Sequence, residues 1–225
     1  MPFTVTRTTT ELADTTFPVY TFNLPADVAA GDLIIAAASG DNLITSFAWA
    51  SPWVELTDTD IAAGTTSSAY LIATGGETTG VLTAAGTADQ VVVHALRITA
   101  ASWHGTTVPE ANATDNGVAA DNPDGGASLN PAGWGTEATL WIIFLGLSGA
   151  ANVTTYPTGF DTNGAHTISS STGMASSWLT ETAASKDPDA YLLDSATNES
   201  VSVVVAVRPA AETFSASRKF LLGIG

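Results

Sequence analysis

Hydrophobic and polar residues alternate with a period of two along much of this chain, which is typical of β-strands that are buried on one face. Residues 19–24 show this alternation clearly, and Pro25 ends the segment. Two other runs, 33–38 and 140–147, are apolar without interruption. In an all-β chain such runs predict strands that are covered on both faces, near the centre of a layered core.

The same pattern predicts strands along most of the sequence and no helix longer than one turn. Turn-forming Gly, Asn and Asp residues separate the strands at the spacing expected of a β-sandwich. A single short helical turn fits within 25–31. The expected strands are 4–10, 19–24, 33–38, 53–56, 69–74, 81–84, 91–99, 140–147, 176–180, 190–194 and 201–207.

Residues 33–98 recur in weakened form at 140–209. Each copy opens with an apolar run that leads into a Ser-Gly turn, and a proline and an aromatic residue follow. Each copy then closes on a β-branched strand that ends in an arginine, Arg97 or Arg208. Because this order is kept while the loops differ by a few residues, the sequence predicts two related halves.

A length of 225 residues fits one large all-β domain or two small ones. We expect a single β-sandwich domain over 1–209, with its halves at about 19–100 and 127–209. The segment 101–126 is rich in Thr, Asn, Asp, Gly and Pro, so we expect it to cross the surface between the halves as a long connection. Residues 210–225 then form a C-terminal tail.

The last eight residues of this tail contain two of the six basic residues of the chain and four large apolar residues. Apolar side chains on a polar terminus need cover. Two interpretations stay open: a final strand on the parent sandwich, or a docking peptide that adds a strand to a partner or fills its groove. For docking, the apolar side chains are the anchors and the basic ones pair with acidic partner groups. The predicted docking residues are Arg218, Lys219, Phe220, Leu221, Leu222 and Ile224.

The formal net charge is −16, with six Lys and Arg residues against 22 Asp and Glu residues. Such a field repels nucleic acid and anionic membranes, so we expect neither as a partner. No apolar run approaches the ~20 residues of a membrane helix, and the start of the chain lacks the pattern of a signal peptide. Because the sequence has no cysteine, disulfides and thiolate metal sites are excluded.

The three histidines, His94, His104 and His166, form no metal-binding pattern such as HxH or HExxH. His94 lies within an expected strand, so we interpret it as a structural histidine whose ring is satisfied by hydrogen bonds. The sequence contains no G-x-S-x-G nucleophile elbow and no strand-to-helix turn to hold one. It therefore predicts no catalytic residues, no metal site and no cofactor.

Two pairs of aspartates stand two residues apart, Asp58 with Asp60 and Asp187 with Asp189. In a strand this spacing places both carboxylates on one face, as glycosidases can use. All four lie next to turn residues, so we interpret them as loop aspartates that bind their own backbone. The second pair and the segment 121–125 could each offer oxygen ligands to Ca²⁺, but neither has the spacing of an EF-hand.

Aromatic rings near loops can stack on sugars, and four of the six tryptophans lie near expected turns. From this group we assign a candidate glycan contact to Trp53 and Trp103. The competing interpretation is that these rings close the ends of the sandwich, because tryptophan usually buries a large area. The four tryptophans are Trp49, Trp53, Trp103 and Trp134.

Four motifs of the first copy carry a resemblance to a known group of proteins. They are G-D-L-I-I at 31–35, P-W-V-E-L at 52–56, A-Y-L-I-A at 69–73 and V-V-V-H-A-L-R-I at 91–98. Their order, with a final R-P, resembles virion-associated proteins of tailed phages and prophages over residues 19–209. The second copy lacks the G-D start, and the resemblance implies no catalytic residues.

Together these features predict an all-β fold, a two-layer antiparallel sandwich or jelly-roll built from two related halves. The resemblance implies a non-enzymatic structural protein on the virion exterior, most directly a capsid decoration or cement subunit. The alternative is a tail-fibre or spike adsorption module that binds host surface glycan. The expected partners are other virion proteins of the capsid or tail, and we expect a homo-oligomer, for which fold analogy suggests a trimer.

Overall fold

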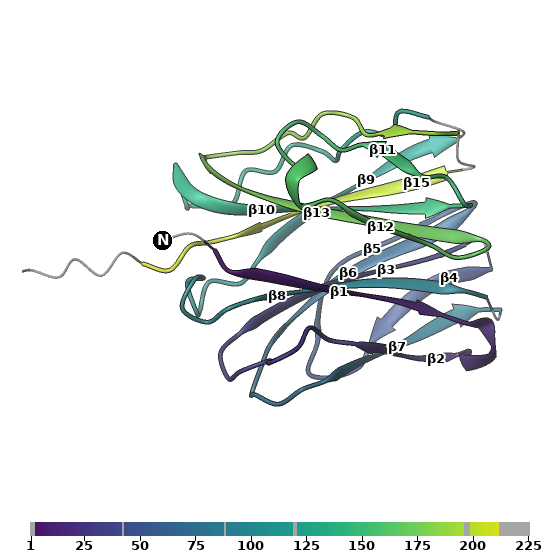
Figure 1. Ribbon diagram of the computed structural model, residues 1–225, viewed down its shortest axis with the longest axis horizontal. Coiled ribbons are helices and arrows are strands. Elements are labelled where there is room, and N and C mark those ends of the chain that lie inside the picture. The colour runs from purple at the N-terminus through teal and green to yellow at the C-terminus, as the bar shows by residue number, and fades with distance from the viewer. Residues whose placement is uncertain (1–2, 42, 88, 119–120, 196–198, 212–225) are drawn as a thin grey trace, which may run out of the picture.

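The computed structural model describes residues 3–41, 43–87, 89–118, 121–195 and 199–211. These residues form an all-β fold whose paired strands are antiparallel. Two five-stranded sheets stack at the centre, and two smaller sheets lie on their outer sides (Figure 1). The predicted antiparallel β-sandwich is therefore confirmed, and the outer sheets are an addition to it.

The first central sheet has the order β1-β8-β3-β6-β5, with β1 (Val5–Leu12), β8 (Val91–Ile98), β3 (Leu33–Asp41), β6 (Gly64–Ile72) and β5 (Val54–Ile61). The second has the order β12-β13-β10-β15-β9, with β12 (Ala165–Ile168), β13 (Thr172–Ala183), β10 (Glu137–Ser148), β15 (Glu199–Val207) and β9 (Glu110–Val118). The outer sheets are β2-β7-β4, with β2 (Val19–Asn23), β7 (Thr79–Gly86) and β4 (Ile44–Trp49), and β11-β14, with β11 (Val153–Thr155) and β14 (Leu192–Leu193). Two short 3₁₀ turns are η1 (Asp14–Thr16) and η2 (Asp161–Asn163).

The uninterrupted apolar runs become the middle strands of the two central sheets. In β3, Leu33 and Ile35 face the second central sheet, whereas Ile34 and Ala36 face the outer sheet. β10 divides its apolar side chains between two layers in the same way. These strands are covered on both faces, as the sequence predicts. Each is also the middle strand of its sheet.

Three apolar layers hold the four β-layers together. Phe144 is buried between the two central sheets, and Phe22 between the first central sheet and β2-β7-β4. Trp141 and Phe160 are buried on the outer side of the second central sheet, beneath loops and the β11-β14 ribbon. Each such side chain contributes about 1.5–3 kcal/mol through removal from water, so every layer adds substantially to stability.

The recurring sequence segments hold equivalent places in the two central sheets. The order β8-β3-β6 in the first sheet corresponds to β15-β10-β13 in the second. The flanking strands correspond as well, with β1 beside β8 as β9 is beside β15. That the halves are related, and that they form a jelly-roll, stay predictions.

The segment 101–126 differs from the expected surface connection, because part of it is a strand. β9 pairs with β15 and forms one edge of the second central sheet. Its inward positions are Ala111 and Ala113, which pack partly buried against the central core. Alanine gives only a weak hydrophobic alternation, which explains why the sequence pattern does not reveal this strand.

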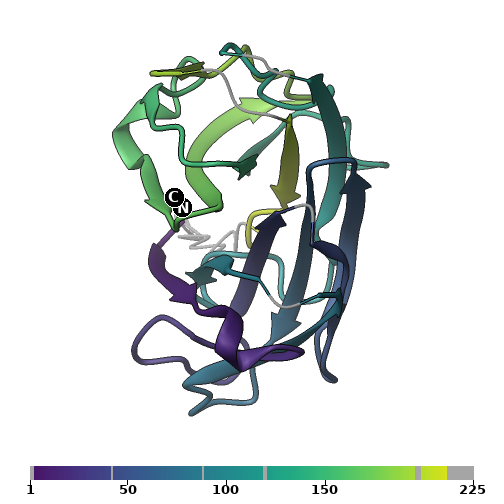
Figure 2. The same cartoon turned by 90° about the vertical axis from the view of Figure 1, so that its right-hand side faces the viewer.

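Both ends of the described chain lie against the turn that follows β8. The amide of Thr99 donates to the carbonyl of Thr4 (3.2 Å), and the amide of Ala210 donates to the carbonyl of Ser102 (3.1 Å). Figure 1 shows the start of β1 at this end of the molecule, and Figure 2 shows the layers from the side, with the second central sheet above the first. No helix in the described part of the chain is long and apolar enough to cross a membrane.

Candidate functional site

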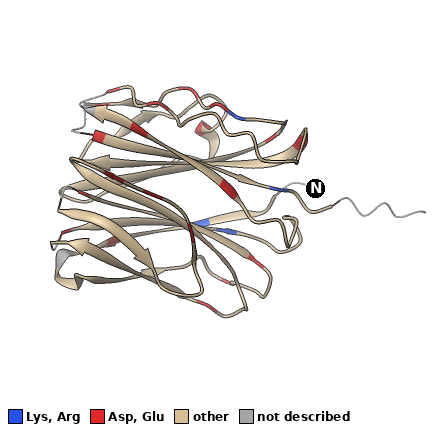
Figure 3. Cartoon of the chain, turned by 180° about the vertical axis from the view of Figure 1, so that it is seen from behind, with Lys and Arg blue, Asp and Glu red and all other residues tan. Residues whose placement is uncertain are grey.

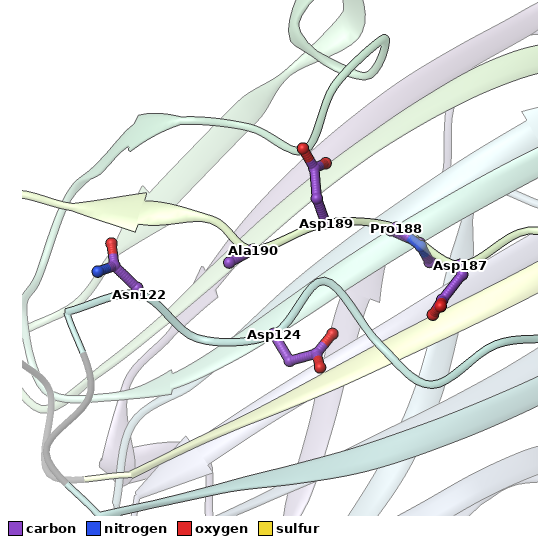
Figure 4. Close-up of a pocket in the computed structure, with 6 residues that line it drawn as sticks. All are labelled: Asn122, Asp124, Asp187, Pro188, Asp189 and Ala190. Atoms are coloured by element: carbon purple, nitrogen blue, oxygen red, sulfur yellow. The ribbon is translucent and has the colours of Figure 1, made fainter.

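Two loops that are far apart in sequence meet on the outer side of the second central sheet and line a pocket of about 370 Å³. The amide of Tyr191 donates to the carbonyl of Pro123, and the amide of Leu193 donates to that of Asp121, both at 2.9 Å. A side chain on Gly125 would lie 2.2 Å from the carbonyl of Asp189, so only glycine permits this approach. The lining residues are Asn122, Asp124, Asp187, Pro188, Asp189 and Ala190 (Figure 4).

The sequence singles out both loops as sources of oxygen ligands, and the structure brings them together in this one pocket. The carboxylate of Asp189 is already engaged, because it accepts hydrogen bonds from the amide (2.6 Å) and hydroxyl (2.7 Å) of Thr158. These hydrogen bonds hold the pKa of Asp189 below its usual value. Figure 4 shows its side chain directed away from that of Asp124. Asp124 and Asp187 therefore supply the acidic groups of the pocket.

The chemistry of the pocket is that of hydrogen-bond acceptors in a negative field. Asp124 accepts the amide of Gly126 (3.0 Å) and keeps its remaining acceptor capacity for other donors. Among the described residues that line the pocket, none is a histidine, a serine or a lysine. Within the described ranges, no group of three or more His, Asp and Glu side chains is placed to hold a metal ion. The pocket thus suits a polar, donor-rich ligand.

A second polar cluster joins the two central sheets around His94 on β8. The Nδ1 atom of His94 lies 2.7 Å from the hydroxyl of Ser176, and its Nε2 atom lies 3.1 Å from the hydroxyl of Thr167. Burial, with the nearby charges of Arg7 and His166, lowers the pKa of His94 to about 3. The ring is therefore neutral at ordinary pH, and both nitrogens are satisfied, as predicted for a structural histidine.

Arg7 on the edge strand β1 adds further hydrogen bonds to this polar cluster between the central sheets. Its guanidinium donates to the carbonyl oxygens of Asn163 (2.7 Å) and Ser176 (3.1 Å), and it lies over the ring of Trp178. The His94–Ser176 contact has the residue types of a base and a nucleophile. Both side chains have no exposed area, however, so a substrate has no access to the hydroxyl. The cluster joins the sheets rather than facing solvent.

Asp58 and Asp60 correct the expectation of loop aspartates, because both lie within the edge strand β5. They pair with Ser67 and Thr65 on β6 and lie on the same face of the strand. Partial burial, with repulsion from Glu55 and Asp60, raises the pKa of Asp58 to about 6. Thr57 and Thr59 are β-branched and favour a strand here, although the turn residues that follow obscure it in the sequence.

The two tryptophans assigned to glycan contact have different places. Trp103 is 1% exposed, and its Nε1 donates to the carbonyl of Gly31 (2.9 Å), so the prediction of a sugar contact at Trp103 is corrected. Its apolar ring fills the end of the central core instead. Trp53 is half-buried and packs against Phe22 and Trp49, with centroid distances of 5.6 and 5.4 Å.

The arginines that close the two sequence copies make corresponding ion pairs, which the sequence analysis did not anticipate. Arg97 pairs with Asp32 (2.5 Å), the acidic residue of the G-D motif. Arg208 pairs with Glu137 (2.5 Å), which precedes the second apolar run. The second copy lacks the G-D start, yet it retains an acid that can reach the closing arginine. A search for acids beside both runs could have found this correspondence.

The predicted docking residues, Arg218 to Leu222 and Ile224, lie outside the described residues. No protein-family model matches the chain, and no curated protein matches it.

Proposed function

We propose that this protein is a non-enzymatic structural protein of the exterior of a tailed-phage particle, most directly a capsid decoration or cement subunit. The observation that carries the proposal is that buried polar side chains connect the parts of the fold to one another. Hydrogen bonds of His94, Arg7 and Ser176 join the two central sheets. Ion pairs of Arg97 and Arg208 stabilise the ends of these sheets. A body whose buried polar groups bind one another suits a role that depends on the surfaces it presents.

The charge distribution adds a second argument. Acidic residues are spread over strands and loops, and few basic residues lie among them (Figure 3). A uniformly negative body resists non-specific association and leaves recognition to a defined segment. The segment 218–225 carries two basic and four large apolar residues, which is the composition needed to bind an acidic, partly apolar groove on another virion protein.

The test is a deletion of residues 218–225 in the phage genome. We expect the truncated protein to fold with an unchanged circular dichroism spectrum and thermal midpoint, and to be missing from purified particles. Stained gels of the particles should show the full-length protein in hundreds of copies, as a decoration role requires.

The matched control keeps the length of the tail and replaces only Arg218 and Lys219 by alanine. If charge pairing and apolar anchoring both contribute, this variant should bind with reduced occupancy rather than not at all. Full incorporation of the truncated protein would refute docking through this segment. A copy number of only a few per particle would refute the decoration role.

The adsorption module is the second candidate, and the open pocket favours it. Asn122, Asp124 and Asp187 offer acceptor oxygens to a donor-rich ligand such as a sugar. Trp53, half-buried beside Trp49, is the remaining candidate for ring stacking. This role predicts a scarce protein whose binding to host cells is inhibited by soluble host glycan, whereas a decoration protein is abundant and indifferent to sugars.

A further inference from the structure

Two carboxylates face each other where the first central sheet meets the turns of the second. Asp41 ends β3, and Asp89 lies in the turn between β7 and β8. Gly40 pairs with Val91, and the amide of Thr87 donates to the carbonyl of Leu43 (2.8 Å), so the chain brings Asp41 opposite Asp89. Asp89 is only 9% exposed, and its Oδ2 atom is buried without a hydrogen-bond donor. Ionised carboxylates only accept hydrogen bonds, so this contact requires a proton or a cation between them.

No described basic side chain supplies that positive charge. Arg97 and Arg208 are paired with Asp32 and Glu137, and Lys186 is paired with Glu181. Arg7, the remaining basic residue of the described ranges, donates to backbone carbonyls on the second sheet. A negative charge is thus concentrated here without internal compensation, in a chain whose formal net charge is −16.

The two carboxylates repel each other when both are ionised. Burial, with the hydrogen bond to Asp41 and its charge, raises the pKa of Asp89 to about 6, which is the effect expected of a carboxylate held beside another without a cation. A bound cation compensates both charges and makes this close approach favourable.

We propose that Asp41 and Asp89 form a binding site for a divalent cation of the calcium type. Carboxylate oxygens are the ligands that Ca²⁺ prefers, and its irregular coordination of six to eight oxygens accepts backbone carbonyls and water in the remaining positions. The hydroxyl of Ser171 donates to Asp89 Oδ1 (3.1 Å) and holds this carboxylate in place. The negative field of the chain raises the local concentration of cations around the site.

The position of the site gives the cation a structural role. Ser171 lies in the turn between β12 and β13, so Asp89 already contacts the second central sheet. Beside it, the amide of Ser170 donates to the Oε1 atom of Gln90 (3.0 Å). A cation on Asp41 and Asp89 therefore stiffens the joint between the central sheets, at the end of the molecule away from the described chain termini.

The experiment is calorimetric titration of the full chain with CaCl₂ at pH 7.5, together with thermal unfolding. We expect one calcium site for each chain and a rise in the thermal midpoint of roughly 5 °C at about 100 times Kd. The double variant Asp41→Asn with Asp89→Asn should lose both responses. The matched control, Asp124→Asn with Asp187→Asn, removes the acids of the open pocket and should keep both.

A further variant guards against a loss caused by misfolding. In Asp89→Asn the amide can donate to Asp41, so we expect a thermal midpoint without calcium at or above that of the unmodified protein, and no calcium response. Absence of calcium binding in the unmodified protein overturns the proposal in favour of a shared proton. Calcium binding that survives in the Asp41/Asp89 double variant, or that is lost in the pocket control, also overturns it.

Discussion

The two central sheets bury equivalent apolar faces but cover them differently. The outer face of the first is closed by the three-stranded sheet β2-β7-β4, with Phe22 and Phe47 in the layer between them. The outer face of the second is closed by loops and the short β11-β14 ribbon, with Trp134, Phe160 and Tyr191 as large plugs. The comparison shows that loops with large aromatic residues can replace a regular sheet as cover.

This difference in cover also determines where the pocket lies. A paired sheet satisfies its own backbone groups and leaves little space between its strands. Loops approach one another at only a few points, such as the contact of Gly125 with Asp189, and leave space between those points. The open acidic pocket therefore belongs to the second sheet, although the central strands of both sheets are equally well buried.

The largest expected effect on the free energy of unfolding comes from removing one buried aromatic ring from each outer layer. Phe22→Ala and Phe160→Ala both delete a fully buried ring, at a cost of about 3–5 kcal/mol in the free energy of unfolding. We expect Phe160→Ala to cost less, because loops can collapse onto the cavity more easily than paired strands. Urea unfolding measures both values.

The controls for this pair are exposed residues of the same covers. Val19→Ala on β2 and Leu192→Ala on β14 should each change the free energy of unfolding by about 0.5 kcal/mol or less. If Phe160→Ala costs more than Phe22→Ala, the loop cover is the more rigid one, and the comparison between the covers is wrong.

A smaller difference is expected between the two ion pairs. Asp32 is nearly buried and also accepts the amides of Ala29 (2.9 Å) and Ala100 (2.8 Å). Asp32→Ala leaves Arg97 and two amides without their partner, so we expect a loss of about 3 kcal/mol. Glu137→Ala breaks a more exposed pair and should cost about 1 kcal/mol or less. Equal losses in chemical denaturation would contradict this ranking.

The smallest step, counted per unit of pH, concerns the joint between the central sheets. The pKa of His94 is lowered to about 3 in the folded protein, whereas an unfolded histidine titrates near its ordinary value of about 6.5. Between these values the unfolded chain binds more protons, so the contribution of His94 to stability is lost as pH falls from about 6.5 to 3. The slope is at most about 1.4 kcal/mol per pH unit.

Two aspartates act in the opposite direction and must be separated from this effect. The pKa values of Asp58 and Asp89 are raised to about 6, so the folded protein binds protons more readily than the unfolded chain between about pH 6 and 4. These groups increase stability as pH falls through that window. His94→Gln, compared with the unmodified protein at each pH, isolates the histidine. A pH profile unchanged by the substitution would show that His94 does not control the joint.

The sequence predicts the parts of the fold that depend on strong local patterns. The apolar runs at 33–38 and 140–147 become β3 and β10, and the alternation at 19–24 becomes β2. β9 is missed because its inward residues are alanines, and β5 is predicted only at its start, by the strand expected at 53–56, because turn residues follow that strand. In both cases pairing with a neighbouring strand decides the structure, and such pairing leaves little trace in a single local segment.

The sites are predictable only in part, for a related reason. The loops at 121–125 and 187–189 are recognisable as oxygen-rich, but their meeting in one pocket depends on the path of the chain. Asp41 ends β3 and Asp89 lies in a turn far along the chain, and no local motif connects them. Trp103 illustrates the opposite error, because a residue next to a loop in sequence can be buried in the core.

The contacts of Thr4 and Ala210 with the turn after β8 have a practical consequence. If the C-terminal segment holds the protein on a particle, the described start of the chain is crowded against the same support. The turns around Leu43, Thr87 and Ser170 then point away from the support. A foreign peptide for display is therefore better inserted at Thr87 than fused to the first residue, and the inserted peptide would be carried at the far tip of each subunit.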